Sequence, residues 1–483
     1  MINFDNTYNK LPAVFHDTVN PASPSDPELI AFNHDLALSL GMNLSNLNDK
    51  ELAQLFSGHT LPKGAEPIAL AYAGHQFGQF SGQLGDGRAH LLGEVIATDG
   101  KRYDIQLKGS GLTKFSRGGD GKSQVGPVVR EYIVSEAMHH LGVPTTRSLA
   151  AISTGDLVYR ESGLPGAVLT RVASSHIRIG TFEYFLMKQD LEGLKTLADY
   201  AINRHYPDLN NKPNAYLLFL QKVIDAQASL IAKWMSYGFI HGVMNTDNMT
   251  ISGETIDYGP CAFMDEFNAN KVFSSIDRQG RYAYHNQSAI GSWNLCRLAE
   301  CLLHITEGDK EKNIEKFTAE LKAYDTKFND AFAKAMGLKL GLMNHDEESI
   351  ALVKEWLTYL EAEELDFTLS FRSLTHHLED THKDSHSDSN NFKEFKTRWL
   401  KKIAQQKQDV PEIKKQMLSV NPAYIPRNHQ VEKAIQNMIN GDNKVFNDLV
   451  TVLKQPFTEQ PGYEDYLNAP TANEIVHKTF CGT

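Results

Sequence analysis

The sequence predicts an α+β protein with a small, β-rich N-terminal part, a larger, mainly helical part and a helical C-terminal extension. Its 483 residues are enough for two or three compact units. Strand-like runs separated by Gly-rich turns crowd residues 74–172, and apolar residues recur at helical spacing from residue 190 onward. We therefore expect a helical N-terminal extension (1–65), a β-rich unit (66–170), a mainly helical unit (171–380) and a helical extension with a tail (381–483).

Composition and charge argue against several classes of partner. The chain is 41% hydrophobic and 22% charged, which is ordinary for a globular protein. Its formal net charge of −11 disfavours a general affinity for nucleic acid or an anionic membrane. Residues 1–5 do not start a basic and apolar leader, and no uninterrupted apolar run approaches the ~20 residues that span a bilayer. We expect a soluble, cytoplasmic protein with no nucleic-acid or membrane partner.

Two helices are expected in the first 60 residues. Pro27 opens and Gly41 ends a predicted helix at about 27–40, and a second covers about 49–56. Neither carries residues that suggest chemistry.

A glycine-rich stretch and a β-hairpin come next. Glycine is dense in residues 74–93, and strands at about 88–97 and 102–107 flank Asp99-Gly100, a strong turn signal. Glycines let backbone N–H groups approach phosphate closely, although loops also contain Gly for other reasons.

Lys108 ends the returning strand, where kinase-like folds place a phosphate-pairing Lys. Such a Lys needs a carboxylate partner. The predicted helix at about 125–141 carries Glu131 and Glu136, of which Glu131 is the expected partner and Glu136 the reserve. The alternative is that these are solvated charges on a surface helix.

More strands are predicted at about 147–160 and 167–172, with residues 154–156 as a turn. The loop at 116–122 carries charges of both signs. Its composition suits a linker, and its position suits a loop that closes over a nucleotide.

Arg171 and Arg178 are seven residues apart, a spacing that would put both on one face of a helix. Guanidinium groups suit multidentate phosphate contacts, but such pairs also form surface salt bridges.

The segment from His241 to Gly259 is the strongest candidate for chemistry. Many kinase-like phosphotransferases carry His-Gly-Asp, four residues and then Asn, but here Val243 stands where the usual catalytic Asp would be. Asp247 directly precedes Asn248 instead, and Asp257-Tyr-Gly supplies a later triplet. A long apolar helix at about 213–237 leads into this segment.

A short hairpin at 249–257 would bring Asn248 and Asp257 side by side, where their oxygens could share a hard cation such as Mg²⁺. The alternative is a hairpin that simply ends in turn-forming Asn and Asp.

The remaining His and Cys residues suggest no metal site. His376, His377, His382 and His386 lie in an Asp/Ser-rich run and are expected to be solvated. No Cys-x-x-Cys pair occurs. Cys296 and Cys301 are expected in the core, while Cys481, near the C-terminus, is expected to be exposed.

Taken together, the motifs resemble those of the selenoprotein O family. They are Gly85-Asp-Gly-Arg88, Gln106-Leu-Lys-Gly-Ser-Gly111, Phe115-Ser-Arg-Gly-Gly-Asp-Gly121, Arg130-Glu131 with Ser135-Glu-Ala-Met138, Pro144-Thr-Thr-Arg147, His241 to Met249 and Asp257-Tyr-Gly-Pro260. The resemblance implies a protein-kinase-like bilobal fold, with units 66–170 and 171–380 as its small and large lobes. It also implies protein adenylyltransferase activity: AMP passes from ATP, bound in reversed orientation, to Ser, Thr or Tyr hydroxyls of proteins, with the chain itself as one candidate acceptor. Pyrophosphate is released, and bacterial members also use UTP.

The resemblance also implies roles for individual residues. Asp247 matches the proposed base, Glu131 the partner of Lys108, and Asn248 and Asp257 the ligands of Mg²⁺ or Mn²⁺. The nucleotide-binding positions are Gly85, Gly87, Arg88, Lys108, Asp120, Gly121, Arg171 and Arg178. Some members carry selenocysteine or Cys near the C-terminus, where this chain has Cys481. In the family this residue is thought to pair with a Cys after the Asp-x-Gly triplet, and in this chain the Cys close to that triplet is Cys261.

Two alternatives stay open from the sequence. The chain could be a true kinase that uses Asp247 as its base, or an ATP-binding scaffold in which Val243 marks lost catalysis.

Overall fold

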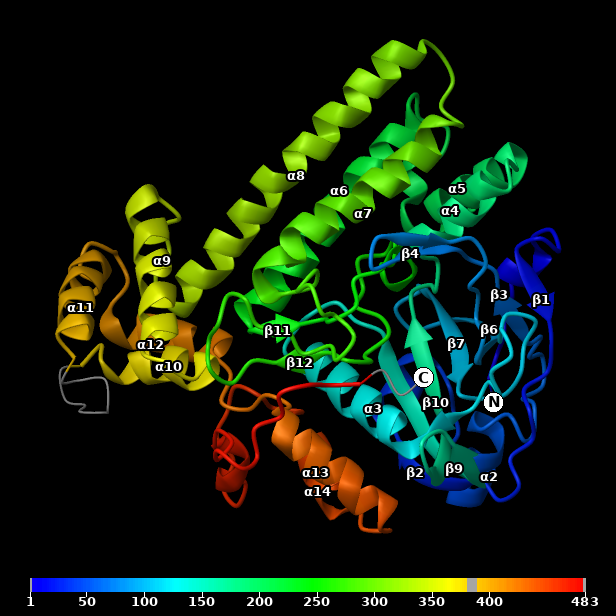
Figure 1. Ribbon diagram of the computed structural model, residues 1–483, viewed down its shortest axis with the longest axis horizontal. Coiled ribbons are helices and arrows are strands. Elements are labelled where there is room, and N and C mark those ends of the chain that lie inside the picture. Colours follow the sequence, from blue (N-terminus) through cyan, green and yellow to red (C-terminus); the bar gives the residue numbers. More distant parts are fainter. Residues whose placement is uncertain (1, 380–388, 481–483) are drawn as a thin grey trace.

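The computed structural model describes residues 2–379 and 389–480. A β-rich part lies beside a group of long helices, and a C-terminal set of helices reaches back to the sheet (Figure 1). The main sheet has eight strands, whose pairings are all antiparallel. Their order is β1 (His16–Thr18), β3 (Ile68–Leu70), β6 (Ala89–Ile96), β7 (Arg102–Lys108), β10 (Gly163–Ala173), β9 (Arg147–Tyr159) and β2 (Glu28–Phe32), with β8 (Ser123–Gln124) paired to β10. The α+β class predicted from the sequence is confirmed.

Helices cover both faces of this sheet. Ala151 and Leu169 point to α3 (Val125–His140), whereas their neighbours Ile152 and Val168 pack in the cluster of α1 (His34–Ser39) and α2 (Asp49–Phe56). The alternation follows from the period of two in a β-strand. The sheet is therefore buried on both sides, which fixes the strands that carry the candidate site.

The predicted hairpin at 88–107 is confirmed as β6 and β7. Its turn is closed by a hydrogen bond from Ala97 N to Lys101 O of 2.8 Å, and Gly100 has a φ of +77°. That left-handed conformation strains residues with a Cβ, so Gly is favoured there. The turn sets the register that brings Lys108 opposite Ala89.

The helical part is built around α6, which packs between α7 and α8 (Figure 1). Of the helices described, α6 is the one long and apolar enough by composition to cross a membrane, and half of its apolar window is buried in this packing. The helices of this part are α4 (Ile179–Met187), α5 (Leu191–His205), α6 (Ala215–Ser236), α7 (Gln287–Leu303), α8 (Lys310–Lys339), α9 (Glu347–Ala362) and α10 (Phe367–Ser373).

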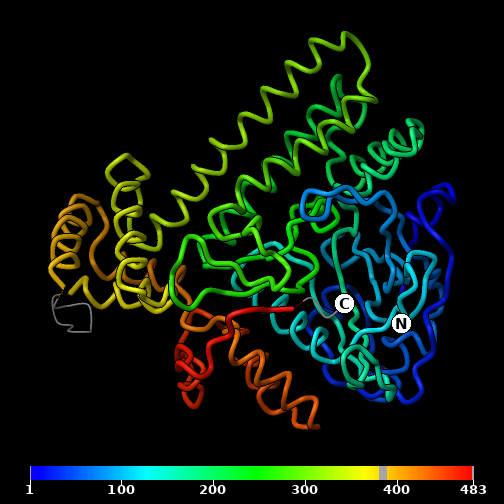
Figure 2. Tube along the Cα trace, viewed as in Figure 1, coloured from blue at the N-terminus to red at the C-terminus, as the bar shows by residue number. Residues whose placement is uncertain are grey.

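The C-terminal helices form two groups. Helices α11 and α12 pack against α9 and α8, whereas α13 and α14 pack against α3. In Figure 2 the last described residues run back toward the middle of the molecule. There Thr479 N donates to Phe273 O at 2.8 Å. These helices are α11 (Asn390–Ile403), α12 (Val410–Val420), α13 (Asn428–Ile439) and α14 (Lys444–Val452).

Short elements complete the chain. Two strand pairs are β4 (Gly74–Gln76) with β5 (Gln79–Ser81), and β11 (Phe239–Ile240) with β12 (Ala262–Phe263). The short 3₁₀ helices are Tyr8–Lys10, Pro207–Leu209, Thr246–Asn248, Tyr284–Asn286, Leu374–His376 and Glu464–Leu467.

Two local predictions were wrong. The helix expected at 27–40 is strand β2 followed by the short α1, because Glu28–Phe32 pairs with β9 and this pairing overrides the signal from Pro27. The segment 1–65 thus adds β1 and β2 to the sheet instead of being purely helical. The turn expected at 154–156 is a bulge inside β9, where the register shifts opposite Gly166 and Gly155 adopts a φ of +73°.

Candidate active site

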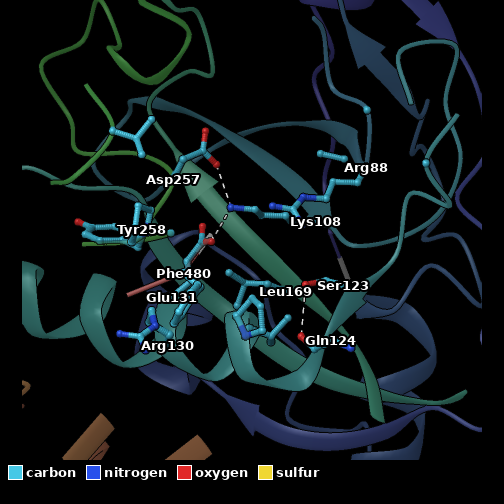
Figure 3. A pocket seen from close by; sticks show the side chains of 18 of the residues that line it. Arg88, Lys108, Ser123, Gln124, Arg130, Glu131, Leu169, Asp257, Tyr258 and Phe480 are labelled. Carbon is cyan, nitrogen blue, oxygen red and sulfur yellow. Dashed lines mark hydrogen bonds and ion pairs between the residues drawn. The ribbon is translucent and has the colours of Figure 1, made fainter. Parts of the chain in front are cut away.

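A cavity of about 730 Å³ lies between the sheet and the segment after α6 (Figure 3). Strands β7 and β10, the start of α3 and residues 243–260 contribute to its wall. It is lined by every residue assigned from the sequence to the site, namely Gly85, Gly87, Arg88, Lys108, Asp120, Gly121, Glu131, Arg171, Arg178, Asp247, Asn248 and Asp257. Residues far apart in the chain therefore converge on one space.

Asp257 is the centre of a cluster of charges. Its Oδ1 lies 2.9 Å from Lys108 Nζ and 2.6 Å from Arg171 Nη1, and its Oδ2 lies 3.4 Å from Arg178 Nη2. Lys108 Nζ also lies 2.6 Å from Glu131 Oε2, so it points between two carboxylates (Figure 3). Glu136 instead accepts hydrogen bonds from Arg147.

The electrostatics of Asp257 follow from these contacts. Burial alone would raise the pKa of Asp257, but Lys108, Arg171 and Arg178 outweigh burial and hold this pKa well below its usual range. The carboxylate therefore stays ionised. Its backbone φ of +61° is rare for a residue with a Cβ and turns the side chain toward the three cations.

The spacing of the two arginines suggested one helix face, but the structure does not place them on one helix. Arg171 lies in β10 opposite Gln106 of β7, whose Oε1 accepts from Arg171 Nη2 at 2.5 Å. Arg178 is the N-cap residue of α4, with its guanidinium carbon 4.4 Å from the centroid of the Tyr72 ring. Strand pairing and the chain reversal bring both to Asp257, so the expected convergence arises from a different local structure.

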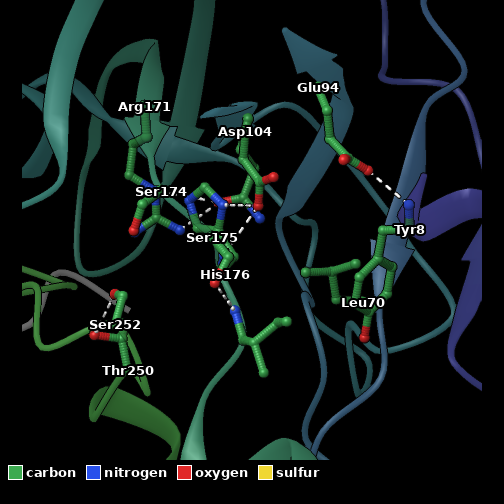
Figure 4. Close-up of polar contacts among 12 residues, drawn as sticks. Tyr8, Leu70, Glu94, Asp104, Arg171, Ser174, Ser175, His176, Thr250 and Ser252 are labelled. Carbon is green, nitrogen blue, oxygen red and sulfur yellow. Dashed lines mark hydrogen bonds and ion pairs between the residues drawn. The ribbon is translucent and has the colours of Figure 1, made fainter. Parts of the chain in front are cut away.

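A buried network fixes the segment between these arginines (Figure 4). His176 N and Nδ1 each lie 2.9 Å from Asp104 Oδ2, and Arg204 Nη2 lies 2.6 Å from Asp104 Oδ1. Asp104 belongs to β7, the strand that carries Lys108. The network thus ties the approach to Arg178 to the strand of Lys108.

Asp247 is almost completely buried, with 7% of its surface exposed. Gln76 Nε2 lies 3.3 Å from its Oδ2, while its Oδ1 has no hydrogen-bond partner among the described residues. Burial raises the pKa of Asp247 to about 6, partly opposed by Arg178. Asp247 lines the cavity, and its raised pKa suits a carboxylate that accepts a proton.

Gly74 makes room for this carboxylate. A Cβ on Gly74 would overlap Asp247 Oδ1. No side chain larger than hydrogen fits there unless Asp247 moves.

The turn around Asp247 is tied to the later triplet through His241. His241 Nε2 lies 2.9 Å from Ile256 O, and Val243 N donates to His241 Nδ1 at 3.4 Å. Burial lowers the pKa of His241, which favours this neutral, bridging form. The hairpin expected at 249–257 is reduced to a single bridge between Met249 and Thr255.

Asn248 and Asp257 supply hard oxygen donors to the same cavity. Asn248 Nδ2 donates to Val243 O at 3.0 Å, which orients the amide and leaves its Oδ1 for another contact. Within residues 2–379 and 389–480, no group of three or more His, Cys, Asp or Glu side chains could hold a metal ion. Asn248 and Asp257 fit Mg²⁺ or Mn²⁺ as a partial ligand set, completed by phosphate and water oxygens.

Sequence reasoning missed Asp86 and the contribution of α13. Asp86 is buried and accepts hydrogen bonds from Leu70 N at 3.2 Å and Gln106 Nε2 at 2.9 Å. The sequence signal was present, because Asp86 lies inside the noted Gly85-Asp-Gly motif. The cavity wall also includes Glu432, Ile435, Gln436 and Ile439 of α13, and Phe480, for which the sequence offered no signal.

The His and Cys predictions had mixed outcomes. His377 is buried, with its ring 4.9 Å from that of Phe392, so its expected exposure was wrong; His376 is exposed. His382, His386 and Cys481 lie outside the described residues. Cys301 is buried in the core, as expected, whereas Cys296 is only half-buried and lies outside the core clusters; Cys261 is buried.

Comparisons with known proteins agree on one family. The family model for "Protein adenylyltransferase SelO" matches residues 1–454. A "Protein nucleotidyltransferase YdiU" from Agrobacterium fabrum is 51% identical over 487 aligned residues, covering 100% of both chains. Two proteins of the same name, from Rhizobium leguminosarum bv. trifolii and Bradyrhizobium diazoefficiens, are each 50% identical to this chain, and each alignment covers 99% of it. The alignments cover 97% of the Rhizobium protein and 99% of the Bradyrhizobium protein.

Proposed function

Because the chain belongs to the SelO family, we propose that it is a protein adenylyltransferase that moves AMP from ATP to Ser, Thr or Tyr hydroxyls of proteins. The observation that carries the proposal is that Val243 stands where the usual base would be, while Asp247 lines the same cavity. Asp247 is buried, and one of its two carboxylate oxygens has no hydrogen-bond partner among the described residues. ATP, and UTP as a second nucleotide, are the proposed donors. Cytoplasmic proteins, with this chain among them, are the proposed acceptors.

The proposed fold is the bilobal arrangement of kinases. The small lobe would consist of α3 and the strands within residues 66–170, to which the 1–65 extension adds β1 and β2, and the helices around α6 would be the large lobe, within 171–380. The site lies between them, and residues 1–65 and 381–483 are proposed as extensions. The pairing of Lys108 on β7 with Glu131 on α3 supports this proposal.

In the proposed step, the acceptor hydroxyl oxygen bonds to the α-phosphorus of ATP. The bond from this phosphorus to the oxygen bridging to the β-phosphate breaks, and pyrophosphate leaves. Asp247 takes the hydroxyl proton, and its pKa of about 6 is close enough to neutrality for that exchange.

The cationic cluster would bind the pyrophosphate end of the nucleotide. Lys108, Arg171 and Arg178 already meet at Asp257, so their positive charge is concentrated before ATP arrives. Gly85 and Gly87 are proposed to bring backbone N–H groups to the phosphates, with Arg88, Asp120 and Gly121 at the same wall. Mg²⁺ or Mn²⁺, held by Asn248 and Asp257, would supply charge neutralisation of the phosphates when bound.

Isotope transfer tests the proposal. ATP labelled at the α-phosphate should mark acceptor proteins in a whole-cell lysate, and ATP labelled at the γ-phosphate should not. The reverse result would favour a kinase that uses Asp247 as its base. Nucleotide-dependent thermal stabilisation without transfer of either label would favour a non-catalytic scaffold.

A further inference from the structure

The β4–β5 hairpin contributes Gln76 and Phe77 to the cavity wall beside Asp247. Its Gln76 contacts Asp247, and Phe77 N lies 3.1 Å from both Asn245 Oδ1 and Tyr282 Oη. Tyr282 Oη donates to the same Asn245 oxygen at 2.7 Å. The hairpin is thus fixed to the residues just before Asp247. An acceptor hydroxyl bound at Asp247 would therefore lie close to this hairpin.

A cluster that we name the arginine face lies against the turn of this hairpin and consists of Arg281, Trp293 and Arg297. The guanidinium carbons of Arg281 and Arg297 lie 5.0 and 4.9 Å from the centre of the Trp293 ring. A Cβ on Gly78, in the hairpin turn, would lie 3.4 Å from Arg281 Cζ, so the turn packs on this guanidinium. The three residues are partly exposed, and none of them lines the nucleotide cavity.

The charges of the arginine face are only partly neutralised. In the described part of the chain, Arg281 forms no ion pair, and Arg297 pairs with Glu300, which is half-exposed. The Nε atoms of Arg281 and Arg297 are buried without a hydrogen-bond partner among the described residues. A surface pair such as Arg297–Glu300 contributes little. Arg297 also interacts with the buried carboxylate of Glu183, which holds His75, so Arg281 is the less neutralised of the two guanidinium groups.

This arrangement is complementary to a carboxylate. Stacking on Trp293 pre-orients the guanidinium planes, and Arg forms bidentate, charge-assisted hydrogen bonds with carboxylates. The net charge of the chain is −11, so a local positive face stands out from the rest. Phe80, 45% exposed on β5, adds an apolar surface near this cluster, because the His75 ring lies 4.9 Å from Phe80 and 5.1 Å from Trp293.

We propose that the arginine face docks an acidic side chain of the acceptor polypeptide, so that hydroxyls close to Asp or Glu are preferred acceptors. The inference rests on the proposed function and specifies the class of acceptor. Phosphate groups of ATP are not the occupants, because their proposed partners lie inside the cavity.

Peptide binding tests the inference without requiring catalysis. Two fluorescent peptides would each carry one Thr, flanked by Glu in one and by Gln in the other. Fluorescence anisotropy would be measured at low salt, with an ATP analogue that cannot be cleaved after the α-phosphate filling the cavity. The full chain should bind the Glu peptide about tenfold more tightly, as expected for a charge-assisted pair.

The variant Arg281→Gln/Arg297→Gln should bind both peptides equally, while Arg398→Gln, an exposed arginine on α11, should keep the preference. Equal binding of both peptides by the unmodified chain, including no binding, would overturn the inference. So would a preference that survives in the double variant or vanishes when the cavity is filled. Failure of α-label transfer by the unmodified chain would instead remove the proposed function, and the binding result would stand separately.

Discussion

Arg171 Nη1 lies 2.6 Å from Asp257 Oδ1, so a proposed phosphate-binding cation and a proposed metal ligand neutralise each other inside the cavity. The same carboxylate holds Lys108 and Arg178. When a triphosphate binds, its phosphate charges would join the Asp257 carboxylate around Lys108, Arg171 and Arg178. The stability of the chain and its activity should therefore both depend on Asp257.

Asp257→Ala is expected to abolish α-label transfer and to lower stability. Removing one partner of a buried ion pair costs about 3–5 kcal/mol, because Lys108, Arg171 and Arg178 then repel one another. Thermal unfolding should show a reduced Tm that pyrophosphate partly restores. The exposed Asp330→Ala, in α8, is the control. Unchanged transfer in Asp257→Ala would contradict the role of Asp257.

Asp247→Asn should remove the proposed base while leaving the nucleotide contacts in place. We expect α-label transfer to fall by about 10²–10⁴-fold, the usual contribution of a general base. Stabilisation by ATP, measured as a shift in Tm, should stay within the range of the unmodified chain. Transfer at the original rate would exclude Asp247 as the base.

Gly74→Ala tests the space beside that base. The added Cβ would overlap Asp247 Oδ1, so transfer should drop at least tenfold while ATP still raises the Tm. Gly82→Ala is the matched control, because its Cβ would come closest to the flexible end of Met187, at 3.3 Å, and would meet Phe80 at an ordinary contact distance of 3.6 Å. Equal activities of the two variants would show that Asp247 tolerates displacement.

The buried Lys339, at the end of α8, should make the stability of the chain depend on pH. It is buried, with Nζ 4.6 Å from the centre of the Phe371 ring, and burial lowers its pKa to about 7. The unfolded chain keeps this proton to a pH of about 10. Between these values the unfolded state binds more protons, so the contribution of Lys339 to stability rises with pH.

Lys339→Met should therefore be more stable than the unmodified chain at pH 7, by a few kcal/mol at most, and this advantage should shrink as the pH rises toward 10. Calorimetric unfolding across that range measures it. Lys334→Met, exposed on the same helix, should show no such trend. A Met variant that is less stable at pH 7 would mean that the aromatic contacts of Lys339 outweigh its burial.

The sequence predicted the parts of the site that depend on local pattern. The Asp99-Gly100 turn and the helix at 125–141 were predictable because turn chemistry and helical periodicity act over short distances. The pairing of Lys108 with Glu131 was expected from the likeness to kinase-like folds, and the two side chains do meet. The residues with chemical roles could be named because their motifs are compact.

Long-range contacts could not be read from the same patterns. Glu28–Phe32 forms a strand only because β9 offers an edge, and Arg171 and Arg178 meet through strand pairing and a chain reversal. The wall formed by α13 depends on packing against α3 across some three hundred residues, as the ion pair of Arg130 with Glu432 shows. Arg281 and Trp293 likewise stack without any recognisable motif.

Mass spectrometry of an acceptor after incubation with ATP tests the central claim most directly, with the chain itself as the first acceptor. The account predicts a Ser, Thr or Tyr that gains one AMP group with the unmodified chain and gains nothing with Asp247→Asn. A residue that gains a single phosphate instead, or an AMP group formed equally well by Asp247→Asn, would contradict it.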